Sequence, residues 1–178
     1  MNDDAIPEDL RKLFAGKRPL DAMFHRLMEL YGRAVSADRC LLFLYEPERH
    51  LARNTHAWQR KPEWALGRPD KAWSPISESL PQKDPLFAEA LINPEALYID
   101  DIETADPALV NAAYERESFG HKALIHAPLM ADGSLWGILE PCTMEAPRQW
   151  TASDRAVTAW VQQKLTPLAI RYVRETCR

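Results

Sequence analysis

The sequence predicts an α+β fold, an antiparallel β-sheet with helices packed on its faces and long helices near both ends of the chain. Apolar residues recur at three- and four-residue intervals near each end, which is typical of amphipathic helices. Between them, pairs of short apolar runs follow each other closely, as the strands of antiparallel hairpins do. With 178 residues, the chain has room for one such domain and not for two comparable cores.

The N-terminal region is predicted to be helical over residues 7–37, where Gly16 and Pro19 separate a short helix from a longer one. The longer helix is indicated by apolar side chains at helical spacing, namely Leu20, Met23, Phe24, Leu27, Leu30 and Tyr31. We therefore expect residues 1–19 to form a tail with a short helix. Residues 20–178 are expected to form a single domain that includes the C-terminal helix.

The first pair of strands is predicted at residues 39–45, an almost continuous apolar run, and at residues 50–60. Residues 61–83 are expected to be irregular because prolines interrupt them repeatedly. The pairs Asp84-Pro85 and Asp106-Pro107 each join an N-cap acceptor to a proline at the first helical position. They predict helices over residues 86–92 and from Asp106 to about Ser118, with a strand over residues 97–102 between them.

The C-terminal part is predicted to contain a β-hairpin and a long helix. Two apolar stretches, residues 123–130 and 135–139, flank Asp132-Gly133, a dipeptide that tolerates the positive φ of a tight turn. Thr151 and Asp154 have the spacing of a capping box, which predicts a helix from there to Arg174. Pro167 is expected to kink that helix.

Composition argues against several classes of protein. The formal net charge is −4, and the basic residues are scattered, so nucleic acid is not expected as a partner. No basic leader with an apolar core and no run of about 20 apolar residues is present, so neither export nor a membrane span is predicted. The three cysteines lack metal-ligand spacing, and the histidines are scattered. We therefore expect a cytoplasmic protein with reduced thiols and no metal site.

The segment LWGILEPCTMEAPRQW at residues 135–150 resembles the closing segment of GAF domains of the cyanobacteriochrome and phytochrome type. Those domains commonly carry a stretch of the same length with the same opening and ending. Asp84-Pro85-Leu86-Phe87 is similar to an Asp-x-Cys-Phe motif of one cyanobacteriochrome subgroup. The resemblance implies a GAF-like fold, a sensory role, and a source in cyanobacteria.

The residues that attach a bilin in those domains are absent from this chain. Leu86 stands at the place of the second linking cysteine, and the helix expected to carry the main linking cysteine reads PALVNAAYERES at residues 107–118. A thioether needs a thiol beside the bilin, so covalent attachment is not expected. The cofactor stays unknown, and a non-covalent tetrapyrrole or another small molecule is possible.

Eight residues are candidates for a ligand pocket between the sheet and the helices of residues 84–118. Strand alternation places Glu140 and Cys142 on one face, where Glu140 could bind a ligand, pair with His126, or face solvent at a bulge. Cys142 is either a reactive thiol or a small buried residue. Trp73 could wall a pocket or pin a loop-rich core. The full set of candidates is Trp73, Asp84, Phe87, Asp101, Tyr114, His126, Glu140 and Cys142.

The leading functional prediction is a sensory or regulatory GAF domain that binds a small molecule non-covalently. It would signal through a protein partner and form a homodimer through its terminal helices. The alternative is a degenerate GAF domain that serves as an interaction module without a ligand. A bilin photoreceptor and a thiol redox protein are weaker alternatives, and no catalytic motif indicates an enzyme. A filled pocket favours the interaction module, and an open cavity near Glu140 and Cys142 favours the sensor.

Overall fold

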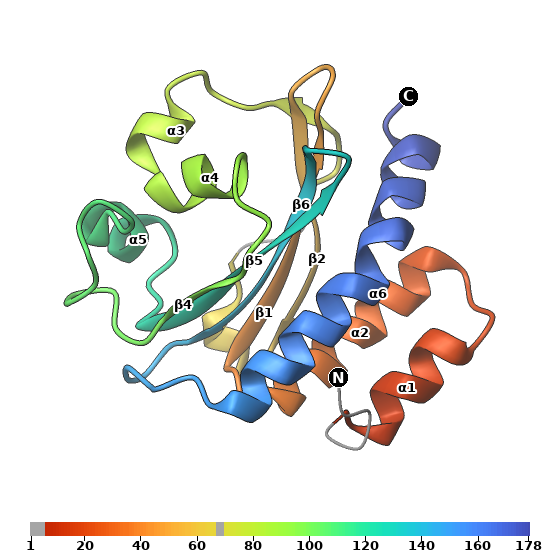
Figure 1. The fold of residues 1–178 in the computed structure, drawn as a ribbon, viewed down its shortest axis with the longest axis horizontal. Coiled ribbons are helices and arrows are strands. Elements are labelled where there is room, and N and C mark those ends of the chain that lie inside the picture. The colour runs from red at the N-terminus through yellow and green to blue at the C-terminus, as the bar shows by residue number, and fades with distance from the viewer. Residues whose placement is uncertain (1–5, 67–69) are drawn as a thin grey trace.

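The protein has one six-stranded antiparallel sheet with helices on both faces, as the α+β prediction requires (Figure 1). The computed structural model describes residues 6–66 and 70–178. The first five residues of the predicted tail, and residues 67–69 of the predicted irregular segment, lie outside the described residues. The strands are ordered β3-β2-β1-β6-β5-β4 across the sheet.

The strands are bounded as follows: β1 Arg39–Glu46, β2 Leu51–Gln59, β3 Ser74–Pro75, β4 Leu97–Ile99, β5 Ala123–Ala131 and β6 Ser134–Thr143. The α-helices are α1 Glu8–Ala15, α2 Leu20–Ala34, α3 Leu80–Lys83, α4 Pro85–Ala90, α5 Ala112–Ser118 and α6 Ala152–Thr176, and η2 Pro62–Trp64 is a short 3₁₀ helix. Helices α1, α2 and α6 cover one face of the sheet, and the short helices α3, α4 and α5 lie on the other (Figure 1).

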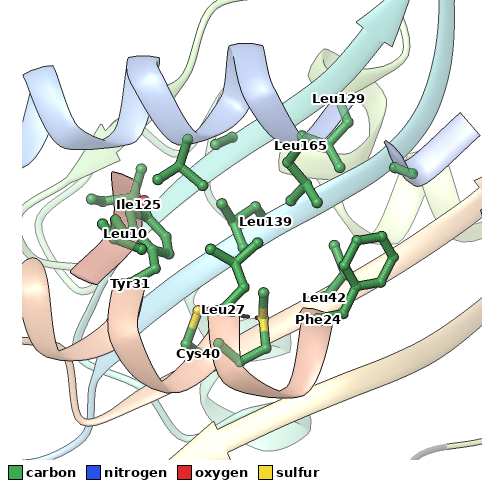
Figure 2. Close-up of a cluster of buried hydrophobic side chains, with 14 of the residues drawn as sticks. Leu10, Phe24, Leu27, Tyr31, Cys40, Leu42, Ile125, Leu129, Leu139 and Leu165 are labelled. Carbon is green, nitrogen blue, oxygen red and sulfur yellow. Dashed lines mark hydrogen bonds between the residues drawn. The ribbon is translucent and has the colours of Figure 1, made fainter. Parts of the chain in front are cut away.

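The larger core lies between the sheet and helices α1, α2 and α6 (Figure 2). Leu42 and Leu139 point into it from the central strands, and Leu27 meets them from α2. Tyr31 on α2 and Thr158 on α6 are joined by a buried hydrogen bond of 2.8 Å. The segment before residue 20 belongs to the same core, since Ile6, Leu10 and Leu13 are buried in it. The amphipathic patterns at the two ends of the chain therefore describe one helical layer.

Two smaller apolar clusters fill the opposite face of the sheet. One surrounds Phe87 and Ile138, and the other surrounds Leu86, Leu124 and Cys142. Both include residues from α4, so this short helix is held to the sheet by apolar contacts in both clusters. The short helices thus stand over a second core that is divided into two clusters.

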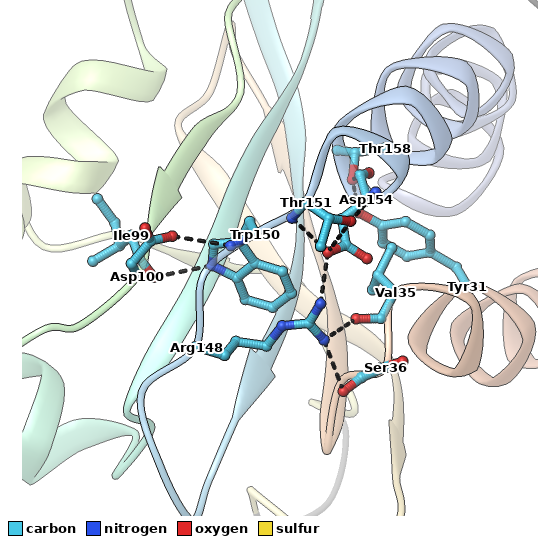
Figure 3. A network of polar contacts seen from close by, with 10 residues as sticks. All are labelled: Tyr31, Val35, Ser36, Ile99, Asp100, Arg148, Trp150, Thr151, Asp154 and Thr158. Atoms are coloured by element: carbon cyan, nitrogen blue, oxygen red, sulfur yellow. Dashed lines mark hydrogen bonds and ion pairs between the residues drawn. The ribbon is translucent and has the colours of Figure 1, made fainter. Parts of the chain in front are cut away.

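The start of α6 is fixed by a polar network around Arg148 (Figure 3). Its guanidinium donates to the Asp154 carboxylate at 2.6 Å and to the Val35 carbonyl at 2.6 Å. Thr151 and Asp154 form the capping box that their spacing predicted. The Trp150 indole donates to the Ile99 carbonyl at 3.0 Å. One segment therefore ties together the end of α2, the start of α6 and the edge strand β4.

Two predicted boundaries were wrong. The strand expected over residues 97–102 ends at Ile99, because the chain turns there and Asp101 accepts a bond from the Glu103 amide. The helix expected from Asp106 begins only at Ala112, capped by the Asn111 side chain. Asp106 instead caps an isolated turn. The predicted helix does not continue from this turn because the chain bends to bury the Val110 side chain.

Pro167 does not end α6, which runs through it to Thr176. Within residues 6–66 and 70–178, no helix combines the length and the apolar character that a bilayer crossing needs.

We expect Gly137→Ala to lower the free energy of unfolding by about 1–3 kcal/mol, as overpacking commonly does. A Cβ atom at Gly137 would lie 2.6 Å from the Phe43 carbonyl oxygen on β1, a backbone atom that cannot move aside easily. Urea unfolding monitored by tryptophan fluorescence measures the change. Gly16→Ala is the matched control, because a Cβ atom there meets neighbours only at 3.4 Å and beyond. Equal stability of the two variants would contradict the proposed close approach of the strands.

Arg148→Met should destabilise the fold by about 1–3 kcal/mol, because it leaves a buried carboxylate and a carbonyl without their donor. Arg171→Met is the control, since the Arg171 side chain is 56% exposed and its ion pair with Glu175 spans 3.8 Å. Such exposed pairs contribute about 0–1 kcal/mol. Thermal unfolding of both variants at equal protein concentration is the comparison, and a loss no larger in Arg148→Met than in Arg171→Met would contradict the structural role of the network.

Candidate functional site

A cavity of about 200 Å³ lies on the short-helix face of the sheet. Strands β1, β2, β5 and β6 form its floor, and helices α3, α4 and α5 close over it. Its lining is apolar for the most part, with a few polar groups placed among aromatic rings. The lining residues are Leu41, Phe43, Asn54, Leu80, Asp84, Phe87, Tyr114, Phe119, His126, Ile138 and Glu140.

The floor of the cavity follows from strand register. Leu41 lies opposite Glu140, and Phe43 lies opposite Ile138, in the antiparallel pairing of β1 with β6. Residues paired across antiparallel strands project to the same face, so all four side chains reach the same side of the sheet. The intervening Leu139 points into the helical core. The alternation predicted for this strand is therefore observed, with Ile138 and Glu140 in the cavity lining.

Glu140 is held by a histidine from the neighbouring strand. Its Oε2 lies 2.9 Å from Nδ1 of His126, and its side chain is 15% exposed. Burial by itself raises the pKa of Glu140, but the hydrogen bond and the charge of His126 outweigh burial and lower that pKa below its usual value. Glu140 is thus an ionised acceptor inside an apolar wall. The sequence allowed three roles for Glu140, and the structure contains one of them, the pairing with His126.

A second histidine and a second glutamate extend this pair into a buried network. His121 Nε2 lies 2.8 Å from Glu115 Oε2, and His121 Nδ1 lies 3.9 Å from Glu140 Oε1. Burial by itself lowers the pKa of His121. The nearby Cys142 sulfur and the Glu115 carboxylate outweigh burial and raise that pKa to about 10. A positively charged imidazole therefore stands between two glutamates behind the cavity wall.

Arg39 adds a second buried cation next to this network. Its side chain is almost fully buried, and its guanidinium donates to the carbonyls of Trp64 at 3.2 Å and Phe119 at 3.0 Å. Its positive charge also lowers the pKa of Glu140. Both partners are backbone carbonyls, one at the end of η2 and one just after α5, so Arg39 holds these two segments against the first strand.

His126 has a ring nitrogen whose hydrogen-bonding capacity is not used. The residue is 4% exposed, and its Nε2 has no hydrogen-bond partner within the described part of the chain. An unpaired buried nitrogen costs free energy unless a ligand or water satisfies it. The geometry therefore offers one imidazole nitrogen, oriented by an ionised carboxylate on the far side of the ring.

Asp84 stands at the opposite wall, at the N-terminus of α4. One of its oxygens accepts the Phe87 amide at 3.0 Å, which is the N-cap role predicted from the Asp84-Pro85 pair. Burial raises the pKa of Asp84 to about 6, and the hydrogen bond from Phe87 opposes that change. The carboxyl therefore titrates close to neutral pH, inside the cavity.

Five of the eight candidate residues line the cavity, namely Asp84, Phe87, Tyr114, His126 and Glu140. The other three candidates, Trp73, Asp101 and Cys142, do not line this cavity. Trp73 packs against the larger core next to the edge strand β3. Asp101 lies in a surface turn beside Asp100 and Thr104. Cys142 shares the face of Glu140, but Leu86, Leu124 and the Met144 sulfur at 3.9 Å enclose it.

Sequence reasoning missed Arg39, Glu115 and His121. Arg39 was included in the first predicted strand, and His121 was one of the histidines described as scattered. No local spacing links Arg39 to residues 80 positions away. A weak signal existed for the other two residues, since Glu115 and His121 flank the end of one helix and lie only six positions apart.

Comparison with known proteins identifies the class. A family model described as GAF domain matches residues 19–160, most of the chain, so the chain belongs to the GAF domain family. No curated protein sequence matches the chain.

Solved structures share the fold at low sequence identity. A far-red-absorbing domain with bound biliverdin IXα is 16% identical, with a TM-score of 0.70 over 96% of this chain and 99% of that one. The phycocyanobilin-bound GAF domain of a cyanobacterial phytochrome is 14% identical, with a TM-score of 0.69 and coverages of 98% and 97%. The GAF domain of an Acinetobacter phosphoenolpyruvate-protein phosphotransferase is 11% identical, with a TM-score of 0.68 and coverages of 98% and 96%.

The raised pKa of Asp84 predicts a pH-dependent stability difference between the wild type and Asp84→Asn. Its folded pKa of about 6 exceeds the usual aspartate value of 3.8, so between these pH values the folded state binds more protons than the unfolded state. Wild-type stability therefore falls as the pH rises through this window. Asparagine keeps the cap without a charge, so the variant should gain up to about 3 kcal/mol relative to wild type from pH 4 to pH 7.

Urea unfolding at a series of pH values measures this difference. Glu103→Gln is the control, because Glu103 is an exposed carboxylate whose pKa is lowered by its bond to Arg116. The control should show no gain between pH 4 and pH 7. A constant stability difference between Asp84→Asn and the wild type over the whole pH range would contradict this prediction. It would show that ionisation of Asp84 inside the cavity does not destabilise the fold.

Proposed function

We propose that this protein is a cytoplasmic sensory GAF domain that binds a small molecule non-covalently and signals through a protein partner. One observation carries the proposal: a cavity of about 200 Å³ whose wall holds the unpartnered Nε2 of His126 and the carboxylate of Glu140. Pockets that bind small molecules are commonly apolar with a few placed polar groups. The aromatic residues that could have filled this space line it instead, which favours the sensor over a ligand-free interaction module.

The size of the cavity limits the ligand. A cavity of about 150 Å³ in a protein interior accommodates benzene, so a cavity of about 200 Å³ fits one ring with a short substituent. A linear tetrapyrrole has four such rings and needs several times this space. The ligand of our proposal is therefore smaller than the bilins found in the similar structures.

The chemistry of the wall limits the ligand further. Glu140 and Asp84 are acceptors when ionised, and the unpartnered Nε2 of His126 can donate or accept according to the tautomer of the ring. These acceptors favour a ligand with N–H or O–H donors. The rings of Phe43, Phe87 and other lining residues favour a flat apolar body. A phenol, an indole or a small aromatic amine combines the two properties.

The cysteines argue against a covalent or redox role. All three are free and buried, and none lines the cavity. Burial raises the pKa of the Cys40 thiol well above its usual value and also raises that of Cys177, which disfavours the reactive thiolate. Among the described residues, the cavity lining includes no serine, cysteine or lysine nucleophile, and our proposal is binding without catalysis.

Ligand binding can be transmitted to α6 through β5. The Gln162 side chain on α6 donates to the carbonyl of Pro128 at 2.6 Å and to that of Pro94 at 3.0 Å. Pro128 lies opposite Ile138 in the sheet, and Ile138 lines the cavity. A ligand that displaces Ile138 or His126 would therefore move the strand to which α6 is bonded.

The proposal includes a homodimer through the terminal helices, formed by their polar outer surfaces. The apolar faces of α2 and α6 are buried within the chain, and Ile92 is the only large apolar residue that is well exposed in the described ranges. Analytical ultracentrifugation over a range of concentrations measures the association. A monomer at all concentrations would exclude this part of the proposal and leave the cavity untouched.

The test of ligand binding is a comparison of Ile138→Phe with the wild type. The larger ring at position 138 should fill the cavity, so binding should fall at least tenfold while the fold is retained. Phenol, indole and benzylamine are titrated by calorimetry, and native mass spectrometry of protein from its own host detects a retained molecule. Ile92→Phe makes the same substitution at a side chain that is 77% exposed, and it should bind like the wild type.

Two results would count against the sensor. Equal binding by Ile138→Phe and the wild type would place the ligand outside the cavity. No retained molecule and no binding of any probe, together with a protein partner that co-purifies, would support the interaction module instead.

A further inference from the structure

A second polar cluster lies on the opposite face of the sheet, away from the cavity. Asp21 and His25 belong to the first turns of α2, and His56 belongs to β2. His56 Nε2 lies 3.3 Å from Asp21 Oδ1, and His25 Nε2 lies 3.8 Å from Asp21 Oδ2. One potential ligand atom from each of the three residues lies within 4.8 Å of the other two.

These separations match the spacing of ligands around a tetrahedral metal ion. Bonds from zinc to histidine nitrogen and carboxylate oxygen are about 2.0–2.1 Å long, which places tetrahedral ligand atoms about 3.4 Å from one another. The contacts of Asp21 with His56 at 3.3 Å and with His25 at 3.8 Å lie near that value and involve different oxygens of the carboxylate. The 3.8 Å contact is too long for a hydrogen bond, so this imidazole and this carboxylate face each other without being directly bonded.

The local structure explains why the three side chains converge. Asp21 and His25 are four positions apart on one helix and therefore share a face. His56 pairs with Leu42 in the sheet and so points to the same helical layer as that residue. The Phe24 ring packs edge-on against the His56 ring at a centroid distance of 5.3 Å. The buried imidazole is thereby held in place.

The cluster is closed on one side and open on the other. The His56 side chain is 1% exposed, whereas the Asp21 side chain is 67% exposed and that of His25 58% exposed. An ion can therefore reach the cluster from solvent.

We propose that Asp21, His25 and His56 form a binding site for a divalent transition-metal ion, with zinc as the best match. Two imidazoles and one carboxylate are a ligand set that zinc uses, and water completes the coordination. The site is distinct from the cavity and does not rest on the proposed function.

The surroundings set the expected affinity and the structural effect. Arg53 is the nearby cation, and its charge opposes a bound dication. Tyr172 on α6 donates to Asp21 Oδ1 at 3.2 Å. We therefore expect micromolar binding and not the tight binding of a structural zinc site. The ion would join α2 to β2 directly and reach α6 through Tyr172.

The test is a titration of the full chain, without a histidine tag, with zinc chloride in a calorimeter. Asp21→Asn and His25→Ala are the test variants, because both side chains are exposed and their loss leaves the core intact. His50→Asn is the matched control, a histidine outside the cluster at a positive φ that asparagine tolerates. Wild type and control should bind one equivalent of zinc, and each test variant should bind at least tenfold more weakly.

Cobalt(II) provides a second measurement, since its visible bands are intense in four-coordinate sites and weak in six-coordinate ones. Wild type should give the intense bands, and His25→Ala should lose them. The proposal is overturned if wild type takes up no zinc at millimolar concentration. It is also overturned if both test variants bind zinc as tightly as the wild type, which would place the ion elsewhere in the chain.

Discussion

The structure depends on the two buried faces of strand β6, the partner of both β1 and β5 at the middle of the sheet. Its side chains alternate, so Leu139 enters the helical core while Ile138 and Glu140 line the cavity. Gly137 lets β6 approach β1 without a Cβ atom against the Phe43 carbonyl. A shift of register by one residue would place the Glu140 carboxylate in the helical core and Leu139 in the cavity wall. The two halves of the molecule are therefore specified together.

Glu140 can be ionised in its buried position because other buried charged groups surround it. His126 bonds to it, and His121 lies between it and Glu115. Arg39 lowers its pKa from the next strand. Removing charges from water is costly, and an arrangement of this kind is weak evidence for stability alone. Its consequence at the cavity is specific, because it fixes the His126 ring and leaves one nitrogen unpaired.

The two faces of the sheet carry different chemistry. The short-helix face holds a partly open cavity with acceptors and aromatic rings. The long-helix face holds a solvent-accessible group of two histidines and an aspartate beside Tyr172. Helix α6 contacts both systems, since Gln162 bonds to the strand next to the cavity and Tyr172 bonds to Asp21. Helix α6 is therefore the element that the two proposed sites share.

The sequence by itself determined the elements whose signals are local. The helical spacing of α2, the hairpin at Asp132-Gly133, the capping box of α6 and the alternation along β6 all follow from periods and turn residues within a few positions. A local signal also misled. Asp106-Pro107 looks like a helix start, but burial of Val110 and capping by Asn111 delay the helix.

Only the tertiary structure decided which distant side chains meet. Alternation put Glu140 and Cys142 on one face, yet the position of α4 left Cys142 behind the cavity wall. The contact of Glu140 with His121, and that of Asp21 with His56, depend on strand register and on helix packing across the sheet. Neither is encoded in spacing along the chain, because residues far apart in sequence are brought together by burial of the apolar faces and not by any local preference.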